Sequence, residues 1–325
     1  MHAARFVGRF IVPFAFALAL QAADEWPQGY IVEENSISPD QRYGIVLPSR
    51  ETGADVEGEG ENTNYFADLK ANRLLGKIEG ADYFQGQNHR GLDVTWSKNS
   101  KFAVVVYEGR FGFWSAVVFE IKDSRFTQTD IGSHIHKAID SVIAKQTQHR
   151  DSGADASPLF RFEPGAKIRV YGTATTNPKQ FEDVKTYYAL FQGLFDVTSK
   201  KWIASAARPL SSDRYDKLER ASSSYDSERF KVSPDGFQGL DGKAEEPQFS
   251  GNDMLFRSEE SKLKYLDDHM NDVYQAVGFL LPPAHFAKVK EEQIEWLKKR
   301  DASSSIAEKS KLTEERTKVL DDLAW

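Results

Sequence analysis

Side chains that could perform chemistry are sparse in this sequence, and its closest histidine pair is His134 and His136. In a β-strand, a spacing of two residues would place both imidazoles on one face and would suit a transition metal. The pair instead lies at the start of an expected helix, where a two-residue step turns the side chains apart. No third ligand is evident near them in the sequence. We therefore expect no metal site here.

Signatures of the common enzyme classes are missing from the sequence. It contains no Gly-x-Ser-x-Gly elbow, His-Glu-x-x-His helix, Walker loop or Gly-x-Gly-x-x-Gly fingerprint. The absence of cysteine also excludes thiolate zinc sites, iron–sulfur clusters and cysteine nucleophiles. Carboxylates are abundant, but a pair of them indicates glycosidase chemistry only through its spatial separation. We expect a non-catalytic protein without a cofactor.

An aromatic run, Phe111-Gly112-Phe113-Trp114, could form a platform on which a sugar ring stacks. Aromatic residues at the start of a strand more commonly belong to the core, and we favour that interpretation. Exposure of the side chains distinguishes the two.

One expected helix carries polar groups on its apolar face. Steps of three and four residues place five side chains on one side of this helix: Phe286, Val289, Gln293, Trp296 and Arg300. A buried amide or guanidinium without a partner costs about 1–3 kcal/mol or more, so Gln293 and Arg300 need partners. The candidates are nearby carboxylates and one hydroxyl: Asp267, Asp268, Asp301 and Tyr274.

Two further helices are expected around this one. Before it, apolar residues recur at three- and four-residue steps from Leu263 to Leu281, and Pro282-Pro283 ends that helix and begins the next. After it, Thr313 is a suitable N-cap for a last helix, with two glutamates at the positive end. The end of the chain is thus expected to form a small helical bundle.

The residues of this bundle resemble the LprI-type lysozyme-inhibitor domain. The family pattern of a tyrosine, then Gln-x-x-Trp-x-x-x-Arg-Asp, then a closing Leu-Thr-x-x-Arg, is met in order. The matching residues are Tyr274, Gln293, Trp296, Arg300 and Asp301, followed by Leu312, Thr313 and Arg316. Many family members carry cysteines around this motif, whereas this chain has three serines at residues 303–305. Packing alone must therefore hold its helices together.

The resemblance implies an exported protein that binds lysozyme or another protein of the cell envelope. Within the helical module, five residues form the candidate site: Tyr274, Gln293, Trp296, Arg300 and Asp301. They either define the fold of the module or contact the partner, and we favour the first role.

Residues 23–250 show the pattern of strands and turns. Short β-branched or aromatic runs, such as residues 102–107 and 116–121, are bounded by clusters of Gly, Pro, Asn and Asp. One helix interrupts them: isoleucines recur at helical spacing from residue 135, and Ser133 is a suitable N-cap.

Two sequence elements recur in this region. A turn followed by a cation, an aromatic residue and an apolar strand occurs at residues 37–47 and 96–106, with a shortened third copy at 232–237. A hairpin pattern, in which an acid ends one strand and a basic residue opens the next, occurs at residues 66–74, 118–126 and 195–202. These units resemble single blades of β-propellers from exported bacterial proteins.

The predicted fold class is α+β. An antiparallel β-rich domain (residues 23–250) with one inserted helix precedes the LprI-like helical module (residues 251–325). A closed propeller needs at least four blades, so we favour a meander or sandwich with blade-like hairpins over a closed propeller.

Residues 1–22 are typical of a secretory signal peptide. Arg5 and Arg9 precede or flank an apolar run without charge, and small residues around Ala22 offer a cleavage site. The run is about half of the ~20 residues that a membrane-spanning helix needs. We therefore expect cleavage, no stable membrane insertion, and a periplasmic or secreted protein.

The formal net charge of −7 disfavours nucleic acid as a partner, because nucleic-acid-binding domains carry a basic face. We expect an exported, non-catalytic binding protein whose helical module binds a lysozyme-type muramidase or another envelope protein. The alternative is an envelope scaffold whose β domain binds a glycan or a protein, with a purely structural helical module.

Overall fold

The structure is a computed structural model that describes most of the 325 residues. The described ranges are residues 26–53, 62–122, 125–147, 154–176, 185–222, 230–233, 247–250 and 253–324. The expected signal peptide, residues 1–22, lies outside them.

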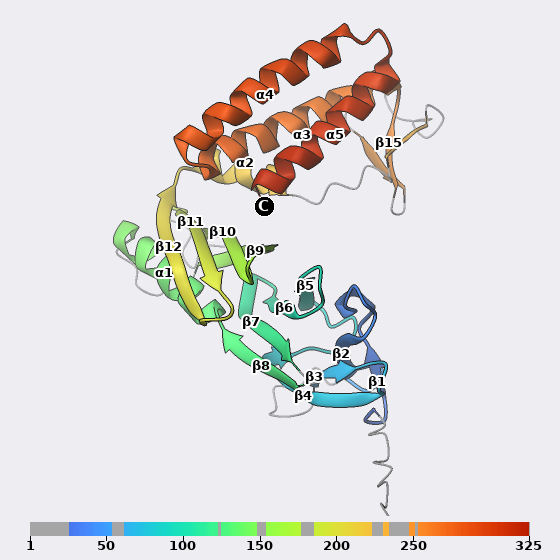
Figure 1. The fold of residues 1–325 in the computed structure, drawn as a ribbon, viewed down its shortest axis with the longest axis vertical. Coiled ribbons are helices and arrows are strands. Elements are labelled where there is room, and N and C mark those ends of the chain that lie inside the picture. Colours follow the sequence, from blue (N-terminus) through green and yellow to red (C-terminus); the bar gives the residue numbers. More distant parts are fainter. Residues whose placement is uncertain are drawn as a thin grey trace, which may run out of the picture.

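Three four-stranded antiparallel sheets follow one another along the chain (Figure 1). The first contains β1 (Tyr30–Val32), β2 (Tyr43–Pro48), β3 (Thr63–Asp68) and β4 (Arg73–Asp82), after a 3-10 turn at Glu34–Ser36. The second contains β5 (Gly91–Trp96), β6 (Phe102–Gly109), β7 (Gly112–Lys122) and β8 (Arg125–Asp130). The third contains β9 (Asp155–Glu163), β10 (Lys167–Thr175), β11 (Tyr188–Asp196) and β12 (Lys201–Leu210). In each sheet, strands adjacent in sequence pair with each other, as in the blades of a propeller.

The three sheets are joined through apolar side chains on both faces of the second sheet. Alternate residues of a strand point to opposite faces. Val105 and Phe119 belong to the core shared with the first sheet, whereas Val104 and Val118 belong to the core shared with the third sheet. This double burial explains why β6 and β7 are near-continuous apolar runs in the sequence.

The recurring turn is a real structural repeat. Before β2, the hydroxyl of Ser38 accepts hydrogen bonds from the backbone of Arg42 and Tyr43 at 3.2 and 2.9 Å. Before β6, Ser97 accepts in the same way from Phe102 at 3.0 Å. Gln41 and Ser100 occupy equivalent positions, with positive φ angles of 57° and 56°.

The corresponding turn of the third sheet lies at residues that the sequence repeat did not include. It joins β9 to β10 at residues 163–167, where Glu163 pairs directly with Lys167; in the first sheet the corresponding backbone bond joins Ser38 to Tyr43. The third turn is thus one residue shorter, which hides it from sequence alignment. Of residues 232–237, Val232 ends a strand of a different sheet, and residues 234–237 lie outside the described ranges.

The three predicted hairpins are confirmed: they join the last two strands of each sheet. Asp68 accepts from the backbone of Ala71 at 3.1 Å in the first, and Asp196 accepts from Ser199 at 2.8 Å in the third. A short acid side chain that bonds the backbone of a turn in this way favours the turn conformation.

One helix, α1 (Gly132–Gln146), lies between the second and third sheets in sequence and packs against both of them. Its apolar face is formed by Ile135, Ile139 and Ile143, all buried. The expected N-cap role of Ser133 is wrong. Ser133 lies inside the helix, and its backbone N–H donates to the carboxylate of Asp130 at 3.2 Å.

Helices cover the face of the third sheet that is turned away from the second (Figure 1). These are α2 (Ser212–Ser222), α3 (Glu259–Leu280), α4 (Pro283–Ala302) and α5 (Ile306–Ala324). Tyr171 and Leu190 of the sheet share a core with Leu218 of α2 and Val273 of α3. The helices therefore bury this face of the third sheet.

A three-stranded sheet precedes α3: β13 (Phe230–Val232), β15 (Asp253–Phe256) and β14 (Gln248–Ser250), in that order. β13 runs parallel to β15, whereas β14 runs antiparallel to it. The α+β class, with a β-rich N-terminal part and a helical C-terminal part, is confirmed.

The expected start of the last helix is wrong. α5 begins at Ile306, so Thr313 lies in its interior and is completely buried. Ser305 stands just before the helix and accepts from the backbone of Glu308 at 3.4 Å. None of the helices in the described ranges combines the length and apolar character that crossing a membrane requires.

Candidate functional site

The predicted site residues lie where α3, α4 and α5 meet. α3 begins with a capping box, in which Ser258 and Ser261 bond each other's backbone N–H groups. It ends at Leu280, and Pro282 and Pro283 start α4, as expected. A side chain at Gly278 would come within 2.9 Å of the Phe286 ring, so this glycine lets the two helices approach closely.

Gln293 is buried and bonds across the bundle. Its side-chain oxygen accepts a hydrogen bond from Nε of Arg316 at 2.8 Å, and its nitrogen donates to the sulfur of Met270 at 3.2 Å. Arg316 also donates to the backbone carbonyl of Val289 at 3.4 Å and lies 3.8 Å from the carboxylate of Glu292. Burial lowers the pKa of Arg316, and Glu292 opposes that shift. Gln293 therefore has a partner, as expected, but that partner is none of the four candidates.

Arg300 forms ion pairs with two of its expected partners. Its Nη1 lies 2.7 Å from Asp267 of α3, and its Nη2 lies 3.0 Å from Asp301. Asp268 instead pairs with Lys264 on the exposed side of α3. The ring of Tyr274 packs against Phe286 at 5.3 Å between centroids. Tyr274 thus supports the α3–α4 contact.

Trp296 joins α4 to α5. Its indole N–H donates to the backbone carbonyl of Leu312 at 3.1 Å, and the side chain is half-buried against the core of the bundle. The guanidinium of Arg300 lies over the ring at 5.0 Å, a cation–π arrangement. Trp296 is therefore a packing residue whose side chain is partly exposed.

Asp267 connects the two parts of the motif. One of its oxygens accepts from Arg300 of α4 at 2.7 Å and from the hydroxyl of Thr313 of α5 at 3.2 Å. Sequence reasoning named Asp267 only as a partner for Arg300 or Gln293. The structure makes it the group that holds all three helices in register. Gln293, Trp296 and Arg300 thus bond to groups on neighbouring helices, whereas Asp301 is largely exposed.

The outward face of α4 is an exposed helix surface of this module. Val289 and Gln293 are its only buried side chains, and α4 lies at the outer edge of the molecule (Figure 1). Glu291 and Glu295 are exposed there, and between them Ile294 is 46% exposed. The family motif did not single out this face.

The two histidines of the pair contact different neighbours. The ring of His134 stacks on Trp202 at 4.7 Å and its Nε2 lies 2.9 Å from the hydroxyl of Ser205, whereas His136 stacks on Phe113 at 4.1 Å. Burial lowers the pKa of both histidines. Within the described ranges, no group of three or more His, Asp or Glu side chains could hold a metal ion.

The aromatic run at the β6–β7 turn is divided between core and surface. Phe113 is buried, as expected, but Phe111 and Trp114 are 49% and 55% exposed. The guanidinium of Arg90 lies 3.4 Å from the centroid of the Trp114 ring and covers one face of it. The core interpretation is wrong for Phe111 and Trp114.

Comparison of the chain with models of protein families, with curated proteins and with solved structures finds no match.

Proposed function

We propose that this protein is an exported, non-catalytic binding protein whose helical module, α3 to α5, binds a lysozyme-type muramidase. The observation that carries the proposal is the outward face of α4. Its inner face is fixed by the Gln293–Arg316 and Arg300–Asp267 bonds, so Glu291, Ile294 and Glu295 are presented on a rigid helix. A rigid surface loses little entropy on binding and suits protein recognition.

Charge supports this choice of partner. The chain carries a formal net charge of −7, and removal of residues 1–22 would take away Arg5 and Arg9 and make it more acidic. A basic lysozyme would be attracted to such a chain, which raises the association rate without fixing the geometry. An exposed isoleucine flanked by acids is a suitable centre for such a contact, because apolar area contributes affinity and charge contributes specificity.

Cell-wall clearing by lysozyme, titrated with the chain lacking residues 1–22, tests the proposal. We expect inhibition that saturates with increasing protein and is weakened at least about tenfold by Glu291→Lys/Glu295→Lys, since two charges reverse at the contact. Glu79→Lys/Asp93→Lys, on exposed positions of β4 and β5, makes the same charge change away from α4 and should inhibit like the unmodified chain. Absence of inhibition at large molar excess contradicts the proposal.

A second function is favoured by the exposure of Phe111 and Trp114. In this alternative the protein is an envelope scaffold whose β-rich part binds a glycan or protein at the β6–β7 turn, and the helices only stabilise it. Aromatic side chains with an exposed face suit stacking against a sugar ring. Phe111→Ala/Trp114→Ala would then abolish binding to cell-wall material, while Glu291→Lys/Glu295→Lys would leave that binding unchanged.

A further inference from the structure

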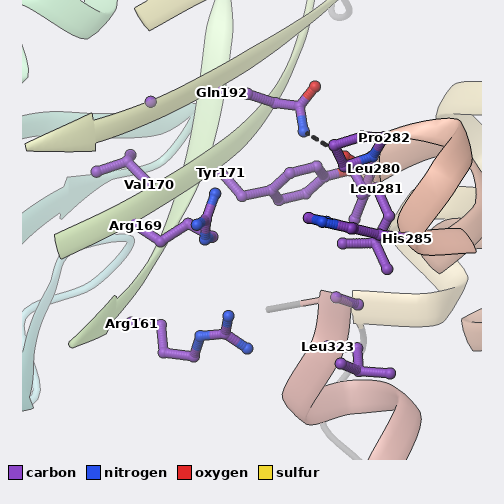
Figure 2. A pocket seen from close by; sticks show the side chains of 12 residues that line it. Arg161, Arg169, Val170, Tyr171, Gln192, Leu280, Leu281, Pro282, His285 and Leu323 are labelled. Carbon is purple, nitrogen blue, oxygen red and sulfur yellow. Dashed lines mark hydrogen bonds between the residues drawn. The ribbon is translucent and has the colours of Figure 1, made fainter. Parts of the chain in front are cut away.

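A cavity of about 260 Å³ lies between the third sheet and the ends of three helices (Figure 2). One wall comes from β9, β10 and β11, with Arg161, Arg169 and Tyr171. The other wall comes from the end of α3, the first turn of α4 and the last turn of α5, with Leu281, His285 and Leu323 among its residues. The cavity is distinct from the motif network and from the outward face of α4.

Two arginines stand directly opposite each other in the sheet at this cavity. Arg161 of β9 is the register partner of Arg169 of β10, and like charges at such positions destabilise a sheet. Glu163 compensates for one charge: it lies 2.5 Å from Nε of Arg169 and 3.5 Å from Nη2 of Arg161. The group of three keeps one net positive charge that an anion can neutralise.

Arg169 keeps hydrogen-bond donors for such an anion. Arg161 also donates to the backbone carbonyl of Asp322 at the end of α5. Among the described residues, Arg169 bonds only through its Nε, to Glu163, so its Nη1 and Nη2 groups are available. His285 likewise makes no hydrogen bond through its ring to a described residue. Figure 2 shows these two side chains reaching into the cavity from opposite walls.

We propose that this cavity binds the carboxylate of a small organic acid. The planar Nη pair of Arg169 matches the two oxygens of a carboxylate, His285 faces the same space, and Leu281 and Leu323 contact the apolar body of the ligand. The volume lies just below the roughly 300–1,000 Å³ of pockets that hold drug-sized ligands. A small free acid and the C-terminal carboxylate of a peptide both fit this description. The inference is independent of lysozyme binding.

Calorimetric titration of the chain lacking residues 1–22 tests this site. The probes are isovalerate and N-acetyl-leucine, with N-acetyl-leucinamide as the uncharged counterpart. We expect at least one acid to bind, the amide to bind at least about tenfold more weakly, and Arg169→Gln to weaken acid binding by a similar factor. Arg110→Gln, on the exposed β6–β7 turn, is the matched control and should bind the acid like the unmodified chain.

Three results would overturn the inference: no acid binds up to about 10 mM, acid and amide bind equally, or inorganic phosphate binds where the acids do not. Circular dichroism and melting of Arg169→Gln verify its fold, and His285→Ala, at an exposed position, provides a second variant that should also weaken binding. A pentapeptide ending in leucine distinguishes the two sources of the carboxylate, a small free acid and the C-terminus of a peptide. Binding of the peptide identifies a chain terminus as the ligand, and its exclusion identifies a free acid.

Discussion

Gln293 of α4 accepts a 2.8 Å hydrogen bond from Arg316 of α5 inside the helical bundle. Both side chains are buried, at 6% and 8% exposed. A buried guanidinium is stabilised only when its donors find acceptors, so this pair ties the position of α4 to that of α5. The outward face of α4 is therefore held in place by a bond that sequence spacing alone did not identify.

Replacing Gln293 by leucine should destabilise the protein. The substitution keeps most of the side-chain volume but leaves Nε of Arg316 without its acceptor. A hydrogen bond to a charged group contributes about 1.5–3 kcal/mol, and we expect a loss of that size in the free energy of unfolding, measured by urea denaturation.

A double substitution distinguishes the effect of this hydrogen bond on stability from the effect of side-chain packing. Gln293→Leu/Arg316→Met removes both polar groups, and replacing a buried polar pair by apolar groups is frequently neutral, so the double variant should recover most of the stability. Glu291→Gln, exposed on the same helix, should change the free energy of unfolding by less than about 0.5 kcal/mol. A double variant less stable than Gln293→Leu would contradict this account of the pair.

Trp296 should stabilise the folded protein in two ways that can be measured separately: through its hydrogen bond and through the packing of its ring. Trp296→Phe removes the hydrogen bond to Leu312 and should cost about 0.5–1.5 kcal/mol. Trp296→Ala also removes the half-buried ring and should cost about 3 kcal/mol, at the lower end for a large aromatic because part of the ring is exposed. Thermal and urea unfolding of the two variants give both values. An unshifted melting curve for Trp296→Ala would show that the ring is not part of the bundle core.

Asp155 should make stability depend on pH. Burial at the start of β9 raises the pKa of its carboxyl to about 6, above the ordinary value of about 3.9. Between these two values the unfolded chain has lost the proton while the folded protein keeps it. This group's contribution to stability is therefore complete below about pH 4 and is lost as the pH rises through 6.

Melting temperatures of the unmodified chain and Asp155→Asn, measured from pH 4 to 8, test this prediction. The asparagine variant should gain stability relative to the unmodified chain as the pH rises, with the difference levelling off above about pH 7. Asp82→Asn, at an exposed position at the end of β4, serves as the matched control. A constant difference across the range would mean that Asp155 titrates normally.

The short turn before β10 should be stabilised by glycine. Ala166 has a φ angle of 55°, a left-handed conformation that costs residues with a Cβ about 1–2 kcal/mol. Glycine adopts it freely but is more flexible in the unfolded chain. We expect Ala166→Gly to raise the free energy of unfolding by up to about 1 kcal/mol, whereas Ala207→Gly in the middle of β12 should lower it. A loss at Ala166 would contradict the assigned turn.

In the β-rich part, local sequence patterns predicted the turns whose conformation depends on bonds between residues close together in the sequence. The hairpins at Asp68 and Asp196 were found because an acid that bonds the turn backbone leaves a clear pattern. The turn at residues 163–167 was missed because its length differs by one residue. The stacking of three sheets and the helical cover of the third could not be read from local patterns, because both faces of a strand look alike when both are buried.

The sequence predicted which residues belong to the candidate site, but only some of the bonds between them. Helical spacing placed Gln293, Trp296 and Arg300 on one face, and the Arg300–Asp267 pair was anticipated. The Gln293–Arg316 bond was not, because Arg316 belongs to another helix and helical spacing relates only side chains of the same helix. The start of α5 was misplaced because Thr313 followed by two glutamates imitates a helix start. Ser305 and Glu308, with the spacing of a capping box, were the better signal. The cavity at Arg169 needs residues from three sheet strands and three helices, which no sequence pattern brings together.

The outward face of α4 is the surface on which the proposed function depends, and hydrogen exchange tests it most directly. Amide exchange of the chain lacking residues 1–22 is measured with and without lysozyme. We predict that added lysozyme slows exchange along Pro283–Ala302, most strongly around Ile294, and leaves α1 and the β6–β7 turn unchanged. Slowing confined to the β6–β7 turn, or no slowing at saturating lysozyme, would contradict the proposal.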